Sequence, residues 1–363
     1  MPAGAVGPAR RRITQTSLAR PPAVARVLER VTVTARRDGM FQPDSKVLVA
    51  VSGGPDSMCL LHSLARLRRL FRLSLTCFHF DHGLREGSAD DAEYVRRHAK
   101  KLGVPFVLRQ ARSKPARGDS IEAWARSERY RAMLTVLEEV EGSAAALGHT
   151  ADDQAETVLL ALLRGGGLEA VAGMRPVSRP FVRPLLGVAR QETEAFCRSL
   201  HLRPRRDPMN EDPTFLRVAI RTLVIPAVEE GVGRAVRATL ARTAALLARD
   251  AAFLQDLATS AAASVVDSDG EDRLLRAGLL ADLPVALSSR IVHREILSLG
   301  QLPAAAHVDA VLALAAAGPG KAVILPGGLR ARREKVYVRL SAALPRRHVP
   351  EDAAGGTHRT ANG

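Results

Sequence analysis

The segment Ser52-Gly53-Gly54-Pro55-Asp56-Ser57 groups two glycines, two serines and a carboxylate. It follows the apolar run Val47–Val51, and a helical pattern of apolar residues begins directly after it. Glycines let an anion approach the backbone N–H groups closely, and a helix N-terminus favours negative charge. Serine hydroxyls can donate to phosphate oxygens, and Asp56 can hold a hard cation that neutralises phosphate charge. These residues therefore predict a polyphosphate site, with a simple helix N-cap as the alternative.

Lysine is scarce in this chain, which has six lysines against 47 arginines and none between Lys114 and Lys321. No Gly-Lys-Ser/Thr follows the glycine pair, so the segment is not a Walker A loop. A phosphate-binding lysine and a covalent lysyl-AMP intermediate are both disfavoured. The segment instead resembles the pyrophosphate loop (PP-loop) of the ATP-pyrophosphatases, which cleave ATP between its α- and β-phosphates to adenylate a substrate.

A second group of candidate residues follows a later apolar run, with His149 ahead of Asp152, Asp153 and Glu156. On a helix, Asp153 and Glu156 share one face at i, i+3 spacing. Acidic residues at a helix start are also ordinary caps. The histidine ahead and the glutamate behind favour a functional interpretation. His82, in the loop after Asp81, is a weaker candidate because loop histidines are often simply solvated.

Apolar strands alternate with helical patterns up to about residue 200, which predicts an α/β fold with a Rossmann-like, doubly wound parallel sheet. Ligands of such sheets bind beyond the C-terminal ends of the strands, where both candidate groups fall. The expected strands are Val47–Val51, Leu73–Phe80, Val104–Leu108, Ala144–Leu147 and Phe181–Val182. The expected helices between them are Ala89–Leu102, Ile121–Val140, Asp152–Leu163 and Gln191–Leu200.

The composition changes near Pro226, which predicts a second, mainly helical domain. We expect a long helix over Val228–Leu257, further helices at Leu274–Leu280, Pro284–Leu299 and Ala305–Ala316, and a closing hairpin. The predicted organisation is a disordered basic tail over 1–21, a PP-loop domain over 22–225, a helical domain over 226–345 and a disordered tail over 346–363.

The net charge of +15 indicates a polyanionic partner, with an arginine-rich surface from a biased composition as the alternative. Eight basic residues and no acid lie between Arg96 and Arg117, and a second basic stretch covers Arg198–Arg221. No apolar run approaches a membrane span, and no hydrophobic signal core is present. The isolated Cys59, Cys77 and Cys197 predict buried thiols in a reducing cytoplasm.

Several motifs in order make the chain resemble the tRNA(Ile)-lysidine synthetase family over roughly Val47 to Leu340. They are Ser52–Ser57, Asp81–Arg85 with Ser88, Glu122–Arg126 with Arg129-Tyr130, His149–Thr157 with Arg164-Gly165, Arg183–Leu186 and Asp207–Pro213. Two departures stand out. Val218 replaces an asparagine of the family's pattern, and Thr150 replaces a second histidine.

The resemblance implies a two-step reaction on the wobble cytidine of tRNA(Ile) with a CAU anticodon. ATP adenylates the carbon-2 oxygen and releases pyrophosphate, and free L-lysine then displaces AMP. The implied cofactors are ATP, bound at Ser52–Ser57, and Mg²⁺, bound by Asp56. The implied catalytic residues are Asp56, Asp153, Glu156, His149 and Arg126. The implied tRNA contacts are Arg112, Lys114, Arg117, Arg129, Arg205, Arg217 and Arg221. The resemblance also implies that the helical domain over 226–345 binds substrate and tRNA. A homodimer is a further expectation.

Three alternatives share the same loop. A tRNA sulfurtransferase of this superfamily would also adenylate a base, but it uses a cysteine pair or an iron–sulfur cluster, which isolated cysteines disfavour. A small-molecule amidotransferase or synthetase would not require the strong positive charge. A nucleotide-responsive tRNA-binding protein without catalysis is disfavoured by the intact Asp56, Asp152, Asp153 and Glu156.

Overall fold

The computed structural model describes residues 21–83, 87–115, 120–205 and 216–342. The chain divides into two compact units, residues 1–248 and 249–363, and the division falls inside helix α10 (Val236–Val265). The domain change that the sequence predicts at Pro226 lies earlier in the chain and remains a proposal. The two predicted disordered tails lie outside the described residues, apart from Pro21.

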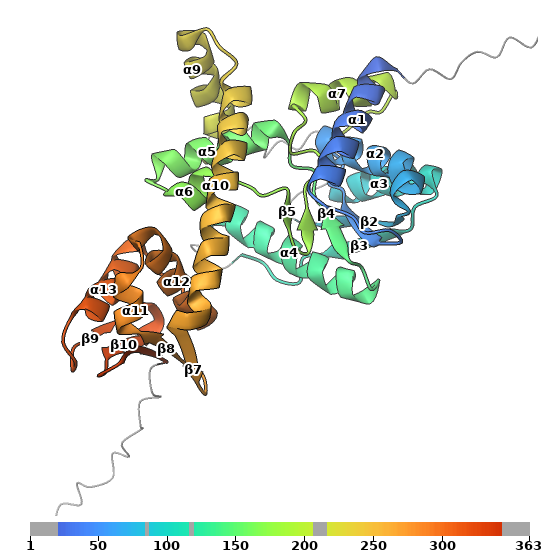
Figure 1. Cartoon of the computed structure of the whole chain (residues 1–363). Helices are drawn as coiled ribbons and strands as arrows, with labels where there is room; N and C mark the ends of the chain where they lie inside the picture. The colour runs from blue at the N-terminus through green and yellow to red at the C-terminus, as the bar shows by residue number, and fades with distance from the viewer. Residues whose placement is uncertain (1–20, 84–86, 116–119, 206–215, 343–363) are drawn as a thin grey trace, which may run out of the picture. The chain divides into compact units, whose positions relative to one another are not determined.

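The first unit is built on a six-stranded sheet in the order β3-β2-β1-β4-β6-β5 (Figure 1). The strands β3, β2, β1, β4 and β6 are parallel, and the short edge strand β5 runs antiparallel to β6. Their bounds are β1 Lys46–Ala50, β2 Ser74–Asp81, β3 Phe106–Gln110, β4 Ala144–Ala146, β5 Val177–Ser178 and β6 Phe181–Val182.

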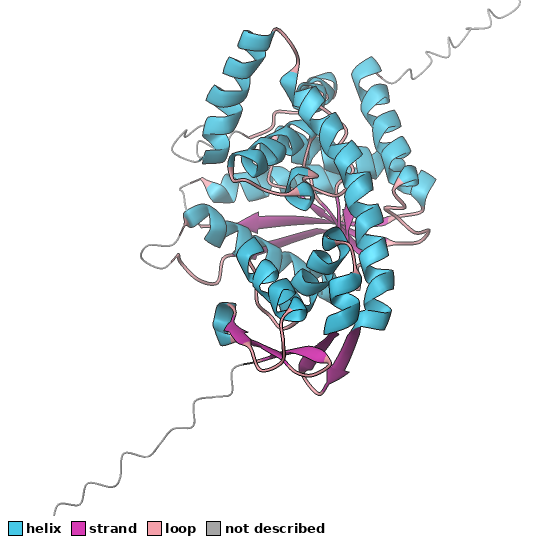
Figure 2. Ribbon diagram, turned by 60° about the vertical axis from the view of Figure 1, so that its left-hand side comes forward, coloured by secondary structure: helices cyan, strands magenta, loops and turns pink. Residues whose placement is uncertain are grey.

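Helices cover both faces of this sheet because its central strands are apolar on both sides. On one face, α1 (Pro22–Arg37), α2 (Pro55–Phe71), α3 (Ser88–Leu102) and α7 (Arg190–Ser199) share a core that includes Val49 and Phe196. On the other face, α4 (Ile121–Glu139) packs Met133 and Val136 against Leu48 and Phe78. Figure 2 shows the strands lying between the helices. The predicted doubly wound parallel sheet is confirmed.

The remaining helices of the first unit include α5 (Ala151–Leu163), which follows β4, and the four-residue α6 (Leu168–Val171). After residue 215 come α8 (Leu216–Ala219), the π-helical turn η2 (Ile220–Val224) and α9 (Ile225–Val232). The predicted single helix over Val228–Leu257 is wrong, because α9 ends at Val232 and α10 starts at Val236. Gly233 adopts a left-handed conformation with φ of 60°, the usual end of a helix.

The second unit combines helices with a five-stranded antiparallel sheet in the order β7-β8-β11-β10-β9. Its strands are β7 Val266–Asp269, β8 Asp272–Arg276, β9 Ala322–Ile324, β10 Arg330–Arg333 and β11 Tyr337–Ser341. Its helices are α11 Ala277–Asp282, α12 Val285–Ser298 and α13 Ala305–Ala316, with a short 3₁₀ turn at Pro326–Gly328. One apolar core unites both classes of element.

Two predictions for this unit are corrected. The segment Leu274–Leu280 is a strand up to Arg276 and helical only from Ala277. The closing hairpin is part of a larger sheet, because β8 pairs with β11 and β10 lies between β9 and β11. None of the described helices has the length and apolar character of a membrane span.

Candidate active site

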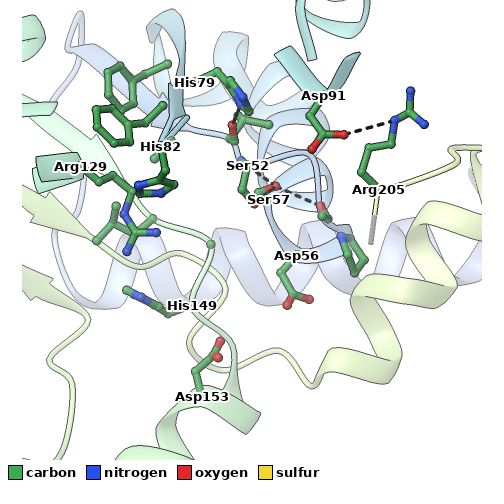
Figure 3. Close-up of a pocket in the computed structure, with 18 of the residues that line it drawn as sticks. Ser52, Asp56, Ser57, His79, His82, Asp91, Arg129, His149, Asp153 and Arg205 are labelled. Atoms are coloured by element: carbon green, nitrogen blue, oxygen red, sulfur yellow. Dashed lines mark hydrogen bonds and ion pairs between the residues drawn. The ribbon is translucent and has the colours of Figure 1, made fainter. Parts of the chain in front are cut away.

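A cavity of about 630 Å³ opens at the C-terminal ends of β1, β2 and β4, as the parallel sheet predicts. The residues around it come from the PP-loop, the ends of β2 and β4, and helices α3, α4, α5 and α7 (Figure 3). Predicted site residues that line it are Ser52, Gly54, Pro55, Asp56, Ser57, Arg129, His149, Asp153, Arg205 and Arg221, and the weaker candidate His82 lines it too.

The PP-loop is closed on itself by the hydroxyl of Ser57. The backbone N–H groups of Ser52 and Gly53 donate to Ser57 Oγ over 3.2 and 3.1 Å, and this hydroxyl donates to the carbonyl of Gly54 over 3.0 Å. Gly53 has a φ of 95°, which disfavours any other residue. Pro55 then starts α2 with a φ that suits the first helical turn. The loop therefore gathers N–H donors at a helix N-terminus, the arrangement that binds phosphate.

Asp56 projects from the first turn of α2 and is held from both sides. Thr193 Oγ1 donates to its Oδ1, and Arg190 Nη2 lies 3.2 Å from its Oδ2. Burial raises the pKa of the Asp56 carboxyl to about 6, although Arg190 and Thr193 act in the opposite direction. The carboxylate is thus costly to leave without a cation.

Two acids occupy the first turn of α5, which Thr150 caps. Thr150 donates its N–H and its hydroxyl to Asp153 Oδ2 over 2.7 and 2.9 Å, so Asp153 is a capping residue, as the alternative interpretation holds. Asp153 Oδ1 also lies 3.5 Å from Arg190 Nη2. Asp152 faces elsewhere, because its Oδ2 accepts the N–H of Arg190 and its Oδ1 pairs with Arg237.

Glu156 lies one helical turn further and is almost fully buried, with a side-chain exposure of 2%. Arg217 Nε lies 3.3 Å from its Oε2, whereas its Oε1 has no hydrogen-bond partner among the described residues. Burial and the neighbouring Asp153 raise the pKa of the Glu156 carboxyl to about 7, against the effect of Arg217. Glu156 is not among the residues that line the cavity.

Arg129 lines the cavity from α4. Arg129 lies near His82 and His149 in Figure 3. Burial lowers the pKa of His149 to about 4, and the nearby arginines Arg183, Arg129 and Arg126 lower it further while Asp153 raises it. His149 is therefore a neutral imidazole at pH 7. Arg126 is exposed, stacks over the Tyr130 ring at 4.8 Å and does not line the cavity.

The other predicted tRNA contacts differ in their distance from the cavity. Arg205 packs over the PP-loop, since its N–H donates to the Gly53 carbonyl over 3.0 Å and its Nε lies 3.6 Å from Asp91 Oδ1. Arg112 and Lys114 are exposed and lie off the cavity. Arg117 and the whole Asp207–Pro213 motif lie outside the described residues.

Sequence reasoning missed three residues that hold the site together. Arg190 and Thr193 belong to α7 and fix Asp56, and Arg237 at the start of α10 fixes Asp152. Arg190 starts the helix that follows the last parallel strand, but nothing in the sequence marks it among 47 arginines. Gly148 has a further role: a Cβ there would lie 3.3 Å from Ser57 Cα, so glycine lets the loop after β4 contact the PP-loop.

Comparisons with known proteins agree with this geometry. A family model described as a PP-loop domain matches residues 24–228, and one described as a TilS substrate binding domain matches residues 275–337. Among solved structures, the U34-tRNA thiolase NcsA from Methanococcus maripaludis superposes with a TM-score of 0.53. It is 16% identical, over 62% of this chain and 80% of that chain, which shows a shared fold alone.

Two curated relatives carry the same description, tRNA(Ile)-lysidine synthase. The protein from Symbiobacterium thermophilum is 42% identical over 284 residues, which are 74% of this chain and 59% of its own length. The chain thus spans little more than half of that relative. The protein from Salinispora tropica is also 42% identical, over 296 residues that cover 79% of this chain and 88% of its own. With its PP-loop and its second matched domain, the chain belongs to the tRNA(Ile)-lysidine synthase family.

Proposed function

We propose that this protein ligates free L-lysine to carbon 2 of the wobble cytidine in tRNA(Ile) with a CAU anticodon. ATP would first adenylate the carbon-2 oxygen and release pyrophosphate, and the lysine amine would then displace AMP. The observation that carries this proposal is the cavity in which the PP-loop, Asp56 and Asp153 meet. Phosphate donors and two carboxylates around one opening suit a reaction whose substrates include a polyphosphate and a cationic amine.

For the first step, the PP-loop would bind the pyrophosphate part of ATP through the N–H groups of Ser52 and Gly53. Asp56 fits Mg²⁺, because its hard carboxylate oxygen lies beside the phosphate-binding loop. No cluster of three or more potential metal ligands exists in the part of the chain that the structure describes. Mg²⁺ is usually held by one or two carboxylates together with substrate phosphates, which one carboxylate here can satisfy. When bound, the ion would offset charge on the leaving pyrophosphate.

For the second step, Asp153 would hold the lysine ammonium, since it lines the cavity and its Oδ2 is fixed by Thr150. The attacking amine must lose a proton, and an acceptor with a pKa near the working pH does this best. Glu156 suits that role, because its pKa is raised to about 7 and its Oε1 has no hydrogen-bond partner among the described residues. Since Glu156 does not line the cavity, the proton would have to reach it beyond Asp153. His149 would stay neutral and orient the edge of the cytosine ring.

For the tRNA, we propose contacts from Arg129, Arg205 and Arg221, which line the cavity. Arg112 and Lys114, in the segment between β3 and α4, would add exposed positive charge. Contacts of this type position the phosphate backbone. Arg217 stays a predicted tRNA contact, although it pairs here with Glu156. Arg126 stays a predicted catalytic residue, and Arg117 a predicted tRNA contact. The predicted boundaries of the two domains, the homodimer and the cytoplasmic location are likewise proposals.

The test is ATP turnover by the purified protein with free lysine and an isoleucine tRNA transcript that has a CAU anticodon. We expect AMP when all three are present and radiolabelled lysine retained in the tRNA. AMP with tRNA but without lysine incorporation would indicate a different adenylating enzyme, such as a sulfurtransferase. The buried Cys59, Cys77 and Cys197 disfavour that outcome, since burial raises their thiol pKa values. tRNA binding without AMP would leave a binding protein.

A further inference from the structure

The two carboxylates that the proposed function needs, Asp56 and Asp153, share one pattern of contacts. In each, one oxygen is held by a threonine hydroxyl: Thr193 donates to Asp56 Oδ1, and Thr150 donates to Asp153 Oδ2. In each, the other oxygen faces Arg190 Nη2, at 3.2 Å for Asp56 Oδ2 and 3.5 Å for Asp153 Oδ1. One guanidinium nitrogen therefore occupies the position from which a cation could contact both carboxylates.

The backbone of Arg190 is fixed independently of its side chain. Its N–H donates to Asp152 Oδ2 over 2.7 Å, and Asp152 Oδ1 pairs with Arg237 Nε at 3.4 Å. The start of α7 thus stays attached to the start of α5 whichever way the guanidinium points. A long arginine side chain on a fixed backbone can exchange partners without moving either helix.

The guanidinium is not saturated by the two carboxylates. Both of its ion pairs use Nη2, while Nε is buried with no hydrogen-bond partner among the described residues. Arginine has five donors and binds phosphate oxygens with two of them at once. An unpaired buried N–H costs free energy, so this placement suits a side chain that has another partner during turnover. The cavity that Arg190 lines also contains the phosphate-binding loop.

We propose that Arg190 is a stand-in cation: it pairs with Asp56 and Asp153 in the ligand-free site, gives way to the cationic ligands, and then pairs with the pyrophosphate part of ATP. This inference rests on the proposed function, which supplies the ligands. The arriving lysine ammonium takes Asp153 Oδ1 from Arg190, and a divalent cation takes Asp56 Oδ2. Arg190 thereby offsets part of the negative charge of the empty site and adds a phosphate contact once the site is filled.

The proposal predicts opposite effects on two ligands when the guanidinium is removed. In Arg190→Gln, lysine meets no competing cation, so its affinity rises by about 2- to 5-fold, the range expected for one partly exposed charge pair. Inorganic pyrophosphate loses a cationic partner, so its affinity falls by a factor of about 10. A purely structural role would weaken both ligands together, and a role only in phosphate binding would leave lysine unchanged.

The experiment is calorimetric titration of the full-length protein with L-lysine alone and with inorganic pyrophosphate alone. Arg190→Lys keeps a cation and should restore both affinities toward wild type. Arg198→Gln is the matched control, because this exposed arginine of the same helix pairs only at 3.7 Å with Glu194. Thermal unfolding of each variant checks that the fold is kept. Unchanged or weaker lysine binding in Arg190→Gln overturns the proposal, whereas a wild-type protein that binds no lysine contradicts the proposed function itself.

Discussion

Glu156 shows how burial tunes a single side chain in this site. Its carboxyl is nearly inaccessible, and the charges of Arg217, Arg190 and Arg221 offset only part of the loss of water around it. The resulting pKa of about 7 is far above that of an exposed glutamate, so near neutral pH the residue can both take and return a proton. The same property has an energetic consequence for the fold, because every pKa shift changes stability with pH.

We predict that Glu156→Gln stabilises the protein at alkaline pH. The folded state holds the Glu156 proton up to about pH 7, whereas the unfolded chain releases it at its ordinary pKa of 4.5. Wild-type stability therefore falls as pH rises between these values and stays lowered above them. The glutamine variant does not ionise, so at pH 8.5 it should gain about 2 kcal/mol over wild type.

Urea unfolding at pH 5.5 and 8.5 measures this effect, and the advantage of the variant should widen with pH. Glu138→Gln is the control, because Glu138 is an exposed glutamate on α4. A constant difference between Glu156→Gln and wild type at both pH values would show that Glu156 ionises normally.

At the scale of elements, the site depends on how closely the loops after β1 and β4 approach each other. Gly148 contacts the backbone of Ser57, and any Cβ there would lie 3.3 Å from both Ser57 N and Ser57 Cα. Backbone atoms cannot move aside as a flexible side chain can. The two loops can approach this closely because Gly148 has no side chain.

We predict that Gly148→Ala separates the PP-loop from the start of α5 and weakens ATP binding by a factor of about 10, because small misplacements of binding groups are costly. Calorimetric titration with ATP measures the loss. Gly167→Ala is the matched control, since nothing lies within 4 Å of the Cβ it would add. Equal ATP affinity of the two variants would mean that the loops tolerate a wider gap.

Helices α2 and α3 meet through a pair of histidines away from the cavity. His62 Nε2 and His98 Nδ1 lie 3.3 Å apart, and Tyr94 packs on the His98 ring at 4.6 Å. Burial, followed by Arg66 and His98, lowers the pKa of His62 to about 3. The folded protein therefore keeps this imidazole neutral where an exposed one is charged.

We predict that this contact makes the protein sensitive to acid. The unfolded chain takes up a proton at His62 below pH 6.5 and the folded chain does so only near pH 3, so stability falls as pH decreases between these values. From pH 7 to 5 the loss from His62 is about 2 kcal/mol. Chemical unfolding should show a smaller acid loss for His62→Leu than for His293→Leu, an exposed control. Parallel pH curves for the two variants would refute it.

The elements that the sequence predicts well are those with a strong local pattern. Short apolar runs such as Val47–Val51 predict buried strands directly. The PP-loop is recognisable because its residues are consecutive in the sequence. The two-residue β5 and the strand β8 are too short or too mixed in charge to show a period. Asp56 and Asp153 are recognisable within their motifs. Arg190 is not, because it is one arginine among 47 and reaches Asp56 only through the fold.

At the scale of the whole molecule, the net charge of +15 is the feature that the fold does not require. Many arginines are already paired with acids, such as Arg339, which contacts Asp269, Asp272 and Glu334. The exposed Arg112 and Lys114, by contrast, lie in a stretch without acids. Charges of the second kind are the ones that release counterions when a nucleic acid binds.

We predict that the double variant Arg112→Gln, Lys114→Gln lowers the slope of log Kd for tRNA against log salt by about 2, or about 1 per lost phosphate contact. Filter binding or fluorescence anisotropy over a salt series measures this slope. Arg37→Gln removes an exposed arginine that is already paired with Asp38 and should leave the slope unchanged. An equal slope for wild type and the double variant would place the RNA backbone elsewhere.

The hydroxyl of Ser57 occupies the N–H groups of Ser52 and Gly53 that the pyrophosphate would use. Binding of a phosphate is therefore an exchange of one acceptor for another, and the gain is smaller than for bare donors. The same exchange favours departure, because the leaving product never exposes an unsatisfied N–H. The loop therefore binds pyrophosphate less tightly and releases it faster, so that the next ATP can bind sooner.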